Sequence, residues 1–90
     1  MNNLKILRKE IDRIDNEILD LLSRRLKIVK NISTVKKKSD KQIFDQFRED
    51  EVKKNWFSKA ELLDMESRNI LRILDEVLKM SKETQLKMIK

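Results

Sequence analysis

One apolar stripe in the first third of the chain constrains its fold more than any other feature. From Leu4 to Val35, apolar side chains recur at alternating steps of three and four residues, the spacing of a helix packed along another helix. The stripe consists of Leu4, Leu7, Ile11, Ile14, Ile18, Leu21, Ile28, Ile32 and Val35. Such a helix extends roughly 50 Å, whereas a compact domain of this size has a radius of gyration of about 12 Å. We therefore expect the stripe to pack against a second copy of the chain.

The residues that are missing from the sequence exclude several classes of function. The chain has no glycine and no proline, which excludes glycine-rich phosphate loops and favours an all-α fold. It also has no cysteine and no histidine, so thiolate and imidazole metal ligands and histidine-dependent nucleophiles are excluded. We expect no metal and no cofactor. Because no apolar run reaches the ~18 residues of a membrane span and no signal-peptide pattern is present, we expect a soluble cytoplasmic protein.

The apolar pattern predicts one domain over residues 1–90, with three helices in the order long, short, long. After the first helix, residues 36–42 interrupt the period and are predicted to form a solvated connection. Asp45 is a suitable N-cap for a second helix from about Gln46 to Phe57. A third helix is predicted from about Glu61 to near Met88. The apolar residues expected to mark the second and third helices are Phe47, Val52 and Trp56, and Leu63, Ile70, Leu71, Leu74, Val77 and Leu78.

Polar side chains interrupt the apolar faces of all three predicted helices. Arg25 occupies the missing position of the first stripe, and Lys36 lies eleven residues later on nearly the same face. On the third helix, Ser81 and Gln85 occupy the next positions of the apolar stripe, where apolar side chains would be expected. One side of the second helix carries Asp45, Arg48 and Glu49. Each interruption alone has a structural explanation, such as an internal ion pair, a helix end that reaches solvent, or a cap. Together they predict a small pocket for a polyanionic ligand with a hydroxyl group.

Arg8 suggests that such a pocket would be shared between two chains. It lies seventeen residues before Arg25 on the same predicted helix, which separates the two by roughly 25 Å. A small ligand cannot touch both arginines of one chain. If both serve a site, Arg8 serves the site of the partner chain, and the site requires a dimer.

Four segments that carry these residues resemble the all-helical chorismate mutase family. They are residues 7–15, residues 21–36 with the arginine and lysine eleven apart, the D-x-x-R-E motif of residues 45–49, and the S-x-x-x-Q motif of residues 81–85. The resemblance covers nearly the whole chain. It implies an all-α fold in which three helices from each of two chains intertwine in a homodimer. It further implies an isomerase that converts chorismate to prephenate in the biosynthesis of phenylalanine and tyrosine, without a cofactor.

The resemblance also implies roles for individual residues. Arg25 and the partner's Arg8 would bind the two substrate carboxylates, with help from Ser81. Lys36 and Gln85 would hold the ether oxygen of the breaking bond.

The remaining candidates would bind the substrate from the second helix. Glu49, with the backbone near Asp45, would take the ring hydroxyl, and Arg48 would complete the polar surface. These groups suit an intramolecular [3,3] rearrangement, which needs no nucleophile, acid, base or metal.

Three alternatives compete with this interpretation. An isochorismate pyruvate lyase of the same fold is the nearest, but that branch lacks the residues equivalent to Glu49 and Ser81, and both are present. A basic helical dimer that binds nucleic acid is suggested by the net charge of +6 and the pI of about 9.7, but only 4% of the residues are aromatic. A purely structural coiled-coil dimer would tolerate Arg25→Leu.

Overall fold

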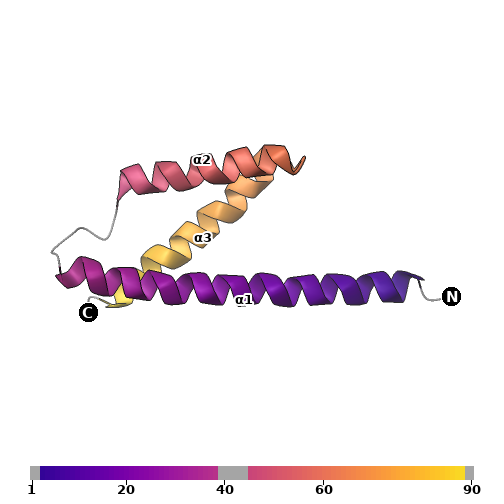
Figure 1. The fold of residues 1–90 in the computed structure, drawn as a ribbon, viewed down its shortest axis with the longest axis horizontal. Helices are drawn as coiled ribbons and strands as arrows, with labels where there is room; N and C mark the ends of the chain where they lie inside the picture. Colours follow the sequence, from indigo (N-terminus) through magenta and orange to yellow (C-terminus); the bar gives the residue numbers. More distant parts are fainter. Residues whose placement is uncertain (1–2, 39–44, 89–90) are drawn as a thin grey trace.

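The computed structural model describes residues 3–38 and 45–88, and every regular element in them is an α-helix (Figure 1). The helices are α1 (Asn3–Lys38), α2 (Gln46–Leu62) and α3 (Ser67–Met88). The predicted all-α class and the order long, short, long are confirmed. In the described ranges, no helix combines the length and the apolar character that crossing a membrane would require.

Helix α3 packs against both of the other helices. It crosses the carboxyl-terminal half of α1 and packs along α2, whereas α1 and α2 do not pack on each other within the described residues (Figure 1). Its apolar stripe forms the centre of the core, where Leu74 is fully buried. The core consists of Val52, Leu74 and Val77, with Leu22, Trp56, Leu71 and Leu78 packed around them. The core therefore centres on α3, together with Val52 and Trp56 of α2 and Leu22 of α1.

The amino-terminal half of α1 extends away from the other two helices (Figure 1). The chain measures 60 × 26 × 15 Å and has a radius of gyration of 16.6 Å, well above the roughly 12 Å of a compact domain of this length. Every member of the apolar stripe is 43% to 64% exposed in the single chain. A continuous apolar face of this length is the typical signature of a helix that packs on a partner.

The boundary between α2 and α3 differs from the prediction. The second helix was expected to end near Phe57 and the third to begin near Glu61, and both expectations are wrong. Helix α2 continues to Leu62, and α3 begins at Ser67. Leu63, expected on the third helix, is instead the residue that caps α2 and is 55% exposed.

A Schellman turn explains where α2 stops. Asp64 adopts a left-handed conformation with φ of 59°, its N–H donates to the Glu61 carbonyl at 3.1 Å, and the Met65 N–H donates to the Ala60 carbonyl at 2.9 Å. These are the two hydrogen bonds that end a helix when one residue turns left-handed. Glycine usually takes that position, and aspartate tolerates it better than most residues. The chain contains no glycine that would mark this turn, so the end of α2 was not predicted.

Two further expectations are corrected at the ends of the helices. Helix α1 continues to Lys38, so residues 36–38 are helical, and the rest of the predicted connection, residues 39–42, lies outside the described residues. Phe47 is 76% exposed, although it was expected beside the buried Val52. A step of five residues turns a helix by about 140°, which places the two side chains on different faces. The predicted start of α2 at Gln46 is confirmed.

Candidate active site

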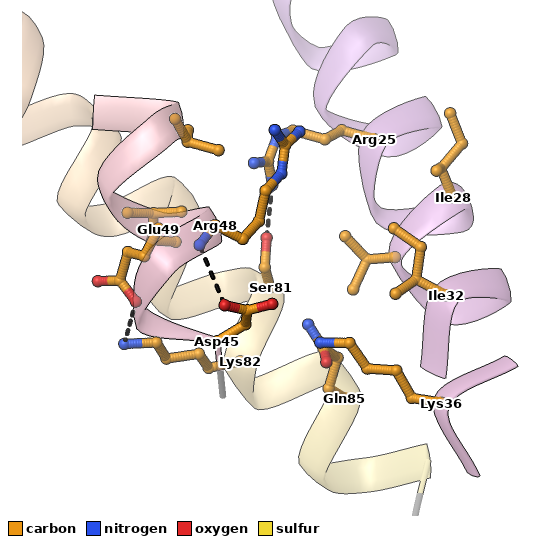
Figure 2. Close-up of a pocket in the computed structure, with 13 residues that line it drawn as sticks. Arg25, Ile28, Ile32, Lys36, Asp45, Arg48, Glu49, Ser81, Lys82 and Gln85 are labelled. Carbon is orange, nitrogen blue, oxygen red and sulfur yellow. Dashed lines mark hydrogen bonds and ion pairs between the residues drawn. The ribbon is translucent and has the colours of Figure 1, made fainter. Parts of the chain in front are cut away.

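A pocket of about 300 Å³ lies between the three helices (Figure 2). Its volume falls in the range typical of small-molecule sites. The pocket has an apolar floor of Ile28, Val29, Ile32, Val52 and Leu78, and its polar lining is Arg25, Lys36, Asp45, Arg48, Glu49, Ser81, Lys82 and Gln85. The fold thus brings together all the sequence-predicted site residues except Arg8, and adds Lys82.

Helix α1 contributes two cations to the pocket, Arg25 and Lys36, whose side chains point into it (Figure 2). The pKa of Arg25 is lowered, first because burial disfavours its charge and second because Arg48 lies nearby. Its Nη1 donates a hydrogen bond to Ser81 Oγ. No acidic side chain in the described parts of the chain forms an ion pair with Arg25. A partly buried cation that is held by a neutral hydroxyl is favourably placed to bind an anion.

Helix α3 contributes two buried polar side chains. Ser81 is 6% exposed and Gln85 is 9% exposed, on the same helix face as the core residue Leu74. Ser81 Oγ donates to the Val77 carbonyl at 3.0 Å while it accepts from Arg25, so the hydroxyl is held in one orientation. Gln85 Oε1 is buried and has no hydrogen-bond partner among the described residues. Buried polar atoms are rarely left unpaired, which makes Gln85 a candidate ligand-binding group.

Helix α2 presents its first turn to the pocket. The side chain of Asp45 caps the helix by accepting from the Arg48 N–H at 3.1 Å. Glu49 lies one turn further along, with a side chain that is only 15% exposed. Arg48 is more open, with a side chain that is 65% exposed and a guanidinium 3.4 Å from Glu51. The cap therefore fixes the start of α2, and with it the position of Glu49.

Lys82 is the pocket residue that the sequence prediction missed. Its Nζ lies 3.1 Å from Glu49 Oε2, so it links α3 to α2 at the edge of the pocket (Figure 2). In the sequence it is one of many lysines, separated from Glu49 by more than thirty residues. The helical register that directs Ser81 into the core offers no sign that the next residue reaches the same pocket.

The charge of the pocket suits a small dianion. Its described lining contains four cations and two carboxylates, an excess of two positive charges. The cations are Arg25, Lys36, Arg48 and Lys82, and the carboxylates are Asp45 and Glu49. Within the described residues, no group of three or more acidic side chains could hold a metal ion.

Arg8 does not reach this pocket in its own chain. It lies on the exposed amino-terminal part of α1, outside the pocket lining. The rise of an α-helix places it roughly 25 Å from Arg25.

Comparison with known proteins identifies the family. The family described as chorismate mutase type II matches residues 7–86. The chain is 52% identical over 52 residues to the bifunctional chorismate mutase/prephenate dehydratase of Aquifex aeolicus (strain VF5), across 58% of this chain and 14% of that relative. It also resembles the structure of a conserved hypothetical protein from Pyrococcus furiosus, with a TM-score of 0.72 and 34% identity over 94% of this chain and 97% of the other. Since the family match includes the whole pocket lining, the chain belongs to the chorismate mutase type II family.

Proposed function

We propose that this chain is an isomerase that rearranges chorismate to prephenate, in the biosynthesis of phenylalanine and tyrosine. The observation that carries the proposal is the convergence of Arg25, Lys36, Ser81 and Gln85 around one pocket of about 300 Å³ in a member of this family. The pocket's excess of two positive charges complements a substrate with two carboxylates. The proposal includes a single catalytic domain over residues 1–90 and a cytoplasmic location, both of which stay predictions.

The reaction requires little of the protein beyond orientation and charge. In the [3,3] rearrangement, the ether C–O bond breaks and a C–C bond forms within one molecule, with no proton transfer and no covalent intermediate. The enzyme lowers the barrier by holding the reactive conformer and by stabilising the negative charge that grows on the ether oxygen. Ammonium, guanidinium and amide groups can do both, so the absence of histidine and cysteine is no obstacle.

The two groups proposed to act at the ether oxygen are Lys36 and Gln85. They point into the same part of the pocket from α1 and α3 (Figure 2). The ammonium of Lys36 and the amide N–H of Gln85 would donate to the ether oxygen as its charge grows. Because Gln85 is 9% exposed, its donor acts in a poorly solvated environment, where such an interaction is strongest.

The substrate carboxylates are assigned to arginines. Arg25, held by Ser81, would bind one carboxylate through its guanidinium, which offers a bidentate and permanently charged donor. The partner's Arg8 would bind the other.

The ring hydroxyl is assigned to Glu49, with the backbone near Asp45, at the start of α2. Arg48 completes the polar surface there. A carboxylate has about four lone-pair sites, so Glu49 can accept a hydroxyl while it also faces lysines.

We propose that the enzyme is a homodimer with shared sites. The exposed stripe of α1 and the distance between Arg8 and Arg25 both support a second chain packed along α1. The test mixes two inactive variants, Arg8→Ala and Arg25→Ala, and measures turnover after subunit exchange. Hybrid dimers have one intact site, so activity should partly return. Exchange without any recovery would reject shared sites.

Direct assay tests the proposed reaction. Purified protein is mixed with chorismate, the loss of chorismate absorbance is followed, and the product is identified as prephenate. A parallel reaction with isochorismate, assayed for salicylate, tests the lyase alternative. Absence of prephenate from a helical, well-folded preparation would refute the proposal.

A further inference from the structure

The carboxylate of Glu49 lies between two lysines, each facing a different oxygen. Lys82 Nζ is 3.1 Å from Oε2, and Lys53 Nζ is 3.8 Å from Oε1. The Glu49 side chain is 15% exposed, whereas the lysine side chains are 42% and 43% exposed. A carboxylate that faces two cations has a restricted orientation and part of its charge offset.

The two lysines connect Glu49 to different helices. Lys53 lies one turn beyond Glu49 on α2, so this pair moves with its own helix. Lys82 lies on α3, lines the pocket and directly follows Ser81. The Lys82 pair therefore sets the position of Glu49 relative to the groups of α3 that face the same ligand (Figure 2).

We infer that Lys82 is a positioning residue for the reaction proposed above, and the inference rests on that function. Lys82 orients the Glu49 carboxylate for the substrate hydroxyl and offsets its negative charge as a dianion enters the pocket. Without this lysine, Glu49 would repel the carboxylates of the substrate and would lose its attachment to α3. The hydroxyl contact exists in both the bound substrate and the transition state, so its weakening raises KM more than it lowers kcat.

The first experiment compares Lys82→Met with Lys79→Met. Lys79 is exposed on the same helix and lies outside the pocket lining, so the two variants lose the same charge from the same element. We expect KM for chorismate to rise about 3- to 10-fold in Lys82→Met, with kcat within about twofold of the wild type. Lys82→Arg should restore KM, and Lys79→Met should leave both constants within about twofold. A Lys82→Met enzyme with wild-type constants overturns the inference.

The second experiment repeats Lys82→Met in a Glu49→Gln background. If Lys82 acts through Glu49, its removal should no longer raise KM, because the amide carries no charge to orient or offset. A rise in KM that persists in this background would show that Lys82 contacts the substrate itself, and would overturn the positioning role.

Folding and wild-type activity separate the remaining outcomes. Loss of the helical circular dichroism signal in both Lys82→Met and Lys82→Arg would make Lys82 a structural residue and overturn the inference. A folded wild-type protein without prephenate formation would refute the proposed function and this inference with it. A folded, active wild type whose KM is insensitive to Lys82 refutes the inference alone.

Discussion

Replacing Arg25 with leucine would separate substrate binding from fold stability at one position. Arg25 occupies a place in the apolar stripe of α1, and burial and Arg48 both lower its pKa. The hydrogen bond it makes in the pocket is to the hydroxyl of Ser81. If the role of Arg25 is to bind a ligand, its charge should contribute little to the stability of the ligand-free protein.

The structure sets the size of the expected change in stability. Breaking a buried ion pair by removing one partner costs about 3–5 kcal/mol, but no described acidic residue pairs with Arg25. Arg25→Leu loses one hydrogen bond to a charged group, about 1.5–3 kcal/mol, while Ser81 keeps its bond to the Val77 carbonyl. The leucine regains about 1.5 kcal/mol from apolar burial and removes the repulsion from Arg48. We expect the free energy of unfolding to stay within about 1 kcal/mol of the wild type, or roughly 8 °C in Tm.

The same substitution should nearly abolish turnover. Loss of one aimed cationic donor lowers the rate by about 10²–10³. Thermal unfolding followed by circular dichroism, at equal protein concentration, measures stability, and loss of chorismate measures activity. Arg24→Leu is the matched control, since Arg24 is the exposed neighbour outside the pocket lining and its replacement should preserve activity. Destabilisation by more than about 3 kcal/mol, or near-normal turnover, would refute the reasoning.

Three further predictions concern the core, the ether-oxygen site and substrate encounter. Leu74→Ala should lower the free energy of unfolding by about 2–5 kcal/mol in urea denaturation, because Leu74 is fully buried, and a loss below about 1 kcal/mol would contradict its central place. Gln85→Glu should be active mainly at acidic pH, where the protonated carboxyl can donate a hydrogen bond to the ether oxygen. The turnover rate of this variant should fall as the pH rises through the pKa of the new carboxyl, and a flat pH profile would contradict the assigned role. The wild-type kcat/KM should fall as ionic strength rises, because a chain of net charge +6 attracts a dianion, and an unchanged value would argue against electrostatic steering.

Helix periodicity is a local property, and for that reason much of this molecule can be predicted from its sequence. The steps of three and four residues from Leu4 to Val35 predict α1, and the cap residue Asp45 predicts the start of α2. Polar residues at apolar positions, such as Arg25 and Ser81, identify the faces that line the pocket. Each of these signals lies within a few turns of one helix.

Tertiary structure decided the features that depend on contacts between helices. Because α3 crosses α1 and packs along α2, Lys82 meets Glu49 across more than thirty residues of sequence. The end of α2 depends on the left-handed turn at Asp64, which could not be predicted because no glycine marks the position. Sequence alone could therefore identify which face of each helix presents the polar side chains of the pocket, because side-chain direction repeats with the helical turn. Which side chains face each other across the pocket depends on how the helices cross, and that is set by packing around Leu74.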